Sequence, residues 1–119
     1  MSKRMDESVI DQDVYAELQE TAGAEFVAEL VDTFLEEAPG MLAELRSARA
    51  ENHSERFRRG AHSLKSNSNT FGALKLAALA RDLEIKGLDA DPARDMAVLA
   101  ELDAECARAA AALKVLRDG

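Results

Sequence analysis

Aromatic residues, cysteine, proline and glycine are all scarce in this chain of 119 residues. Aromatics make up 4% of the residues, with no tryptophan, although apolar residues make up 47%. The core must therefore be built from small aliphatic side chains, and alanine at this density favours closely packed helices. Two prolines and six glycines argue against an all-β fold, which needs more turns. The composition favours an all-α protein, and the length fits one domain.

Long apolar runs and a net positive charge are also absent. No apolar run approaches the roughly 18 residues of a membrane span, and the first eight residues lack the apolar region of a signal peptide. The net charge of −8 disfavours nucleic acids and anionic membranes as partners, because both need a basic footprint. The single cysteine, Cys106, cannot form an internal disulfide, so we expect the protein to reside in the reducing cytoplasm. We expect Cys106 itself to be a small, buried, apolar residue.

Apolar residues recur at three- and four-residue spacing in five segments, and each is predicted to be a helix. The predicted helices cover residues 9–21, 24–50, 52–71, 73–86 and 92–117. Pro39 and Gly40 interrupt the second segment, so we expect a kink or a local irregularity there. Asn52 is predicted to cap the third helix, with Glu55 completing a capping box, and Gly72 to end it.

The lengths of these segments predict an architecture. Four long helices with short connections indicate an antiparallel up-down four-helix bundle. The shorter first helix is expected to pack across one end as a cap. We assign residues 9–119 to this domain and residues 1–8 to a flexible N-terminal tail.

Basic residues concentrate around His62, although the protein as a whole is acidic. Residues 46–65 hold six basic and two acidic residues, and the rest of the chain holds nine basic and 21 acidic ones. An acidic protein partner or a phosphoryl group is the natural counterpart of such a basic island. The alternative is a solvated helix face that merely carries arginines, and the alignment of the island with His62 favours the first interpretation.

Helical geometry predicts that His62 faces solvent. At about 100° per residue, the apolar side chains of its segment, together with Ala61 and Ser68, lie on the opposite side. The residues within about 60° of His62 are Arg58, Arg59, Lys65, Ser66 and Asn69. An exposed imidazole keeps a nitrogen free to act as a nucleophile. Lys65, one turn further on, is best placed to touch the oxygens of an attached phosphoryl group.

Other chemistries lack the residues that they need. A metal site requires three or four ligands, and the only other histidine, His53, lies nine residues away. A Ser-His-acid arrangement requires a carboxylate that orients His62, whereas we expect cations on that face. No Gly-rich phosphate loop is present, so we expect no nucleotide site, no resident cofactor and no kinase activity. A phosphoryl group would have to come from another protein.

Residues 61–73 resemble the signature of histidine phosphotransfer domains. The resemblance rests on the run His62-Ser63-Leu64-Lys65 with the flanking Ala61 and Phe71-Gly72-Ala73. It extends over nearly the whole chain, and it includes the short leading helix, the run from Phe34 to Pro39, and Leu83-Glu84.

The resemblance implies a monomeric helical bundle that acts in phosphorelays. Such domains accept a phosphoryl group on the imidazole Nε2 from an aspartyl phosphate of a receiver domain, and they pass it to another receiver. The receiver supplies the acidic pocket and the Mg²⁺, so the histidine domain mainly provides positioning and charge neutralisation. His62 is then the phosphoacceptor, Lys65 stabilises the phosphoryl group, and receiver domains, a hybrid sensor kinase or both are the partners. The residues expected to contact the partner are Arg58, Arg59, Ser66 and Asn69.

Ser66 departs from the family pattern, in which glycine commonly follows the lysine. That glycine leaves room above the histidine, and serine is the next smallest polar choice. The departure bears on fine geometry and partner preference rather than on the role of His62. It leaves open an alternative function, a non-catalytic helical adaptor that binds a receiver or kinase domain without relaying phosphate.

Overall fold

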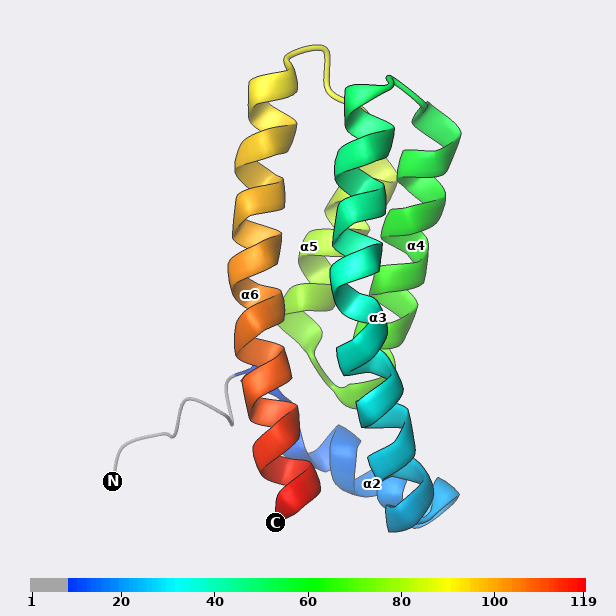
Figure 1. Ribbon diagram of the computed structural model, residues 1–119. Coiled ribbons are helices and arrows are strands. Elements are labelled where there is room, and N and C mark those ends of the chain that lie inside the picture. Colours follow the sequence, from blue (N-terminus) through cyan, green and yellow to red (C-terminus); the bar gives the residue numbers. More distant parts are fainter. Residues whose placement is uncertain (1–8) are drawn as a thin grey trace, which may run out of the picture.

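The computed structural model describes residues 9–119, which form a bundle of helices (Figure 1). No strand occurs in this range, so the predicted all-α class is confirmed. The helices are α2 (Gln12–Ala22), α3 (Ala24–Ala50), α4 (Ser54–Phe71), α5 (Leu74–Lys86) and α6 (Pro92–Asp118). The tail predicted for residues 1–8 lies outside the described residues.

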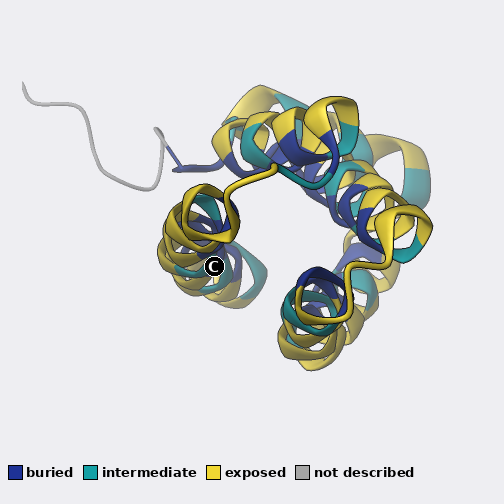
Figure 2. Ribbon diagram, turned by 90° about the horizontal axis from the view of Figure 1, so that it is seen from above, coloured by how far each residue is buried: buried dark blue, intermediate teal, exposed yellow. Residues whose placement is uncertain are grey.

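The four long helices form an antiparallel ring, as predicted. Helix α3 packs against α4 and α6, and α5 packs against the same two helices from the other side. Helix α2 contacts α3 and α4 and crosses the end of the bundle at which the C-terminus lies (Figure 1). Seen along the bundle, the buried residues of all four helices face the inside of the ring (Figure 2). No helix in residues 9–119 is both long and apolar enough to cross a membrane.

The core is made mostly of aliphatic side chains, with a few aromatic rings between them. Phe57, Leu45 and Leu64 are fully buried where α3 meets α4, and the rings of Phe34 and Phe71 lie 5.6 Å apart. Cys106 is buried on the inner face of α6, as predicted. Burial raises the pKa of the Cys106 thiol, so this residue acts as a small apolar side chain.

The start of α4 differs from the prediction by one residue. His53, not Asn52, is the N-cap, and its Nδ1 accepts a hydrogen bond from the Arg56 N–H at 3.2 Å. Asn52 instead adopts a left-handed conformation with φ of 55°, and its Oδ1 accepts a hydrogen bond from Arg49 at 2.7 Å. The prediction of a capping box at Asn52 is therefore wrong, because Asn52 lies in the turn between α3 and α4 and binds Arg49 there.

The other helix ends follow local sequence signals. Helix α2 begins three residues later than predicted, because Asp11 caps it by accepting the N–H groups of Asp13 and Val14. Gly72 ends α4 in the left-handed conformation, as predicted. Helix α3 passes through Pro39 as one continuous helix, so this proline does not divide it.

Candidate functional site around His62

His62 projects into solvent from the middle of α4. Its side chain is 57% exposed. The residues of α4 predicted to face the core are all buried, namely Phe57, Ala61, Leu64, Ser68 and Phe71. The Ser68 hydroxyl donates to the Leu64 carbonyl at 2.7 Å, which satisfies its polar group inside the core. The outward helical phase of His62 is thus confirmed.

A carboxylate of the neighbouring helix holds the imidazole ring, contrary to expectation. The Oε2 atom of Glu84 on α5 lies 2.8 Å from Nδ1 of His62. Because an ionised carboxylate can only accept a hydrogen bond, Nδ1 must carry the hydrogen. In the neutral ring, the lone pair is then on Nε2, the nitrogen on the side away from this contact. Glu84 therefore fixes both the orientation and the tautomer of His62.

Glu84 also binds the lysine that follows His62 by one turn. Its Oε1 atom lies 2.8 Å from Nζ of Lys65. The hydrogen bonds from Lys65 and His62, the former being the stronger influence, lower the pKa of Glu84. The carboxylate is therefore ionised at neutral pH, and Lys65 is held beside the imidazole ring. Sequence reasoning missed this role of Glu84, although Leu83-Glu84 was part of the family resemblance.

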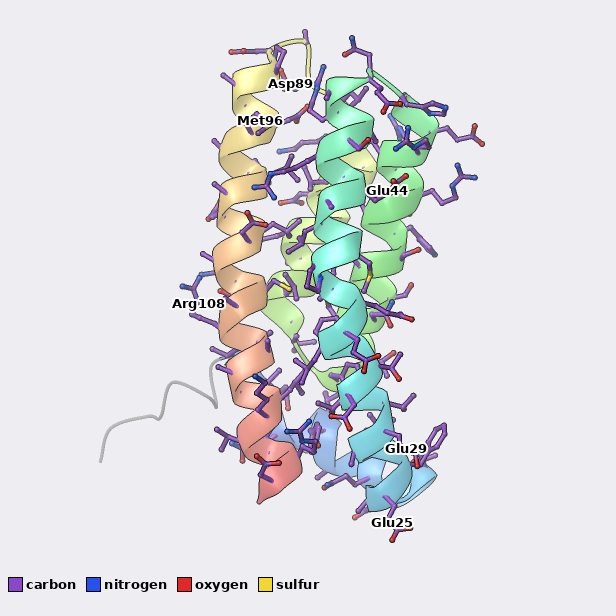
Figure 3. The ribbon with its side chains drawn as sticks, in the orientation of Figure 1. Glu25, Glu29, Glu44, Asp89, Met96 and Arg108 are labelled. Atoms are coloured by element: carbon purple, nitrogen blue, oxygen red, sulfur yellow. The ribbon has the colours of Figure 1, made fainter. Side chains whose placement is uncertain are left out.

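The basic island is largely neutralised by acidic residues of its own bundle. Figure 3 labels Glu44 on α3, whose carboxylate binds Arg56 of α4 with an Nε–Oε2 distance of 2.8 Å. The ion pairs of the island are Arg46–Asp103, Arg49–Asp95, Arg56–Glu44, Arg56–Glu51 and Lys65–Glu84. Within residues 9–119, only Arg58 and Arg59 of the island form no ion pair with an acidic side chain. The expected free basic surface is therefore much smaller than the charge count suggested.

Two grooves flank the ridge on which His62 stands. One of about 510 Å³ lies between α3 and α4, with Arg59, Gly60 and Ser63 on the α4 side. Another of about 230 Å³ lies between α4 and α5 and includes Lys65 and Asn69. A partner that reaches His62 therefore meets concave surface on both sides of α4.

The four residues predicted to contact a partner all lie on the solvent side of α4, but they differ in what they touch. Arg59, Ser66 and Asn69 are exposed around His62. Arg58 is also exposed, yet its Nη1 donates to the main-chain carbonyl of Glu84 at 3.3 Å. Across the described range, no cluster of three or more histidine, cysteine or acidic side chains could hold a metal ion.

Comparison with known proteins gives the family. The model of the Hpt domain family matches residues 29–112, which include α4 and His62. The chain therefore belongs to the Hpt domain family and is a histidine phosphotransfer protein of phosphorelays. Members of this family interact with receiver domains and kinases.

A solved structure supports the same assignment. The chain is similar to histidine-containing phosphotransfer protein B (HptB) from Pseudomonas aeruginosa PAO1, with a TM-score of 0.78 and 28% sequence identity. The match covers 92% of this chain and 95% of the other. A search of curated protein sequences gives no match.

Proposed function

We propose that His62 is the phosphoacceptor of this phosphotransfer protein and that residues 9–119 form the functional domain. The observation that carries this proposal is the contact between Nδ1 of His62 and Glu84. It leaves Nε2 as the nucleophilic atom of a ring that is more than half exposed. The phosphodonor is the aspartyl phosphate of a receiver domain, and a second receiver takes the phosphoryl group away.

The transfer needs only one bond to form and one to break. The Nε2 lone pair forms the N–P bond, while the P–O bond to the partner's aspartate breaks and its electron pair leaves on that carboxylate. The Nδ1 proton stays on the ring, where the negative charge of Glu84 balances the positive charge of the phosphorylated imidazole. Lys65, held beside the ring by Glu84, stabilises the oxygens of the phosphoryl group.

The surface around His62 fits a protein donor. His62 stands on a convex helix without a nucleotide-binding loop, and Arg59, Ser66 and Asn69 are exposed beside it. These residues contact the receiver in our proposal, and the receiver brings the Mg²⁺ and the acidic pocket. The protein acts as a monomer in the cytoplasm.

Phosphate uptake from a phosphorylated receiver tests the assignment. Wild-type protein is expected to acquire acid-labile phosphate, and His62→Gln is expected to acquire none. His53→Gln is the matched control, because His53 caps α4 at its N-terminus and lies two and a half turns from His62. Uptake by His62→Gln would refute the proposal. Receiver binding by the wild type without any uptake would instead favour the non-catalytic adaptor.

A further inference from the structure

Three residues on one face of α4 converge on Glu84. His62 and Lys65 bind its carboxylate, and Arg58, one turn before His62, donates to its main-chain carbonyl. Glu84 lies in the last turn of α5, which ends at Lys86. Carbonyls in a last turn have no partner within the helix, and a cation there also interacts favourably with the helix dipole. Arg58 thus binds the backbone of the residue whose side chain holds the imidazole ring.

The position of Arg58 depends on a glycine at the end of α5. Gly87 has a positive φ of 68°, and a Cβ atom at this position would lie 2.5 Å from Nη2 of Arg58. The guanidinium group therefore packs directly over Gly87, where no side chain larger than hydrogen would fit beside it. The absence of a side chain at Gly87 thus leaves room for the guanidinium group of the exposed Arg58 to reach the Glu84 carbonyl.

We propose that Arg58 is a positioning residue, which fixes the last turn of α5 and thereby the contact between Glu84 and His62. The inference rests on the proposed function, because it concerns the orientation of the same histidine. It also gives Arg58 a different role from Arg59, which makes no such contact with α5 in the described structure. Arg58 acts within the domain, whereas a docking residue acts only when a partner is present.

Two measurements without any protein partner test this role. The first is the ¹⁵N NMR spectrum of the imidazole of His62, which reports the fraction of the neutral ring that carries its hydrogen on Nδ1. The second is the rate at which phosphoramidate, a small phosphodonor that releases ammonia, phosphorylates His62. The variants are Arg58→Ala and Glu84→Ala, alone and combined. The control is Lys86→Ala, which removes another cation from the last turn of α5.

Arg58→Ala is expected to lower the ratio of the Nδ1–H tautomer to the Nε2–H tautomer by about threefold, the size of one exposed hydrogen bond, and to lower the phosphoramidate rate with it. Lys86→Ala is expected to change neither. In the Glu84→Ala background, the Arg58 substitution is expected to have little further effect, because both residues act through the same contact. Arg58→Lys, which keeps a donor at this position, is expected to restore part of the loss.

Three results would overturn the inference. The first is an Arg58→Ala protein whose imidazole spectrum and phosphoramidate rate equal those of the wild type, and which is slow only in phosphoryl transfer from a receiver. The second is an equal effect of Lys86→Ala. The third is full additivity of the Arg58 and Glu84 substitutions. The NMR measurement needs no phosphate transfer, so the inference about Arg58 stands or falls separately from the assignment of His62 as phosphoacceptor.

Discussion

At the scale of single residues, one carboxylate organises the chemistry of the site. Glu84 binds His62 with one oxygen and Lys65 with the other, both at 2.8 Å. Two side chains that are separated by one turn of α4 are thus held by one residue of α5. The position of the imidazole ring therefore depends on how α4 and α5 pack, not on α4 alone.

The titration of Glu84 tests this contact. Its pKa is lowered in the folded protein, first by Lys65 and then by His62. The stabilising contribution of the contact is therefore complete above the unfolded-state pKa of about 4.3. It is lost as the pH falls through the lower folded-state value. We expect the side-chain carboxyl carbon of Glu84 to titrate below the range of ordinary glutamates in an NMR experiment.

Lys65→Ala provides the matched comparison for that titration. Removal of the stronger hydrogen bond is expected to bring the midpoint of Glu84 back toward the ordinary value. An unchanged midpoint would mean that Lys65 does not contact Glu84 in solution.

The same Lys65→Ala substitution is expected to slow phosphoryl transfer from a receiver. The loss is about tenfold, the value of one hydrogen bond from a charged donor in the transition state. Stopped-flow or quench kinetics give the rate, and circular dichroism is expected to show an unchanged fold because Lys65 lies outside the core. A wild-type rate at low salt would remove Lys65 from the mechanism.

The sequence predicts the residues of the site only where they are neighbours on one helix. The phase of His62 and Lys65 follows from 3.6 residues per turn, so their common exposed face could be deduced. Glu84 lies 22 residues further along, and its contact depends on the register of α5 against α4. No local sequence pattern predicts that register. The expectation that no carboxylate orients His62 was therefore wrong.

At the scale of helices, the short connections rely on special backbone conformations. Gly72 joins α4 to α5 in the left-handed conformation, and its carbonyl accepts the N–H of Asp11 at 2.8 Å. This turn therefore also anchors the segment that leads into α2. The glycine and its position could be predicted from the sequence, but the contact with Asp11 could not, because it joins residues distant in the chain.

Gly72→Ala is expected to destabilise the protein by about 2 kcal/mol, since a Cβ is strained at positive φ. The added Cβ atom would also lie 2.8 Å from the Asp11 carbonyl oxygen. Chemical denaturation measures the free energy of unfolding. Gly40→Ala is the control: a Cβ there meets nothing within 4 Å, so in this helical position alanine should stabilise by about 0.5 kcal/mol. Equal effects of both substitutions would contradict the structure of the turn.

At the scale of the whole molecule, a buried ion pair joins both halves of the bundle at the end opposite α2. Arg49 of α3 binds the Asp95 carboxylate of α6 at 2.5 Å and the Asp89 carbonyl at 2.8 Å. Asp89 lies in the connection between α5 and α6 at that end (Figure 3). The sequence predicts the up-down arrangement from helix lengths alone, whereas this cluster requires knowing that α3 and α6 are neighbours.

Arg49→Ala is expected to lower the free energy of unfolding by about 3 kcal/mol, because it leaves Asp95 buried without its partner. Arg46→Ala breaks the pair with Asp103 on the same two helices. It should cost less than about 1 kcal/mol, because both of those side chains are more than a third exposed. Urea denaturation of the two variants gives the comparison. A loss no larger for Arg49 than for Arg46 would contradict the assigned burial.

The contact between Glu84 and His62 also bears on the direction of signalling. A ring held at Nδ1 offers the same nitrogen to every partner, whether that partner delivers phosphate or removes it. Any stability that Glu84 gives to the phosphorylated ring is the same for both partners and cancels over the two transfers, so this contact cannot favour one direction over the other. If His62 is the phosphoacceptor, the net flow is set outside this protein, by the relative stabilities and concentrations of the phosphorylated partners.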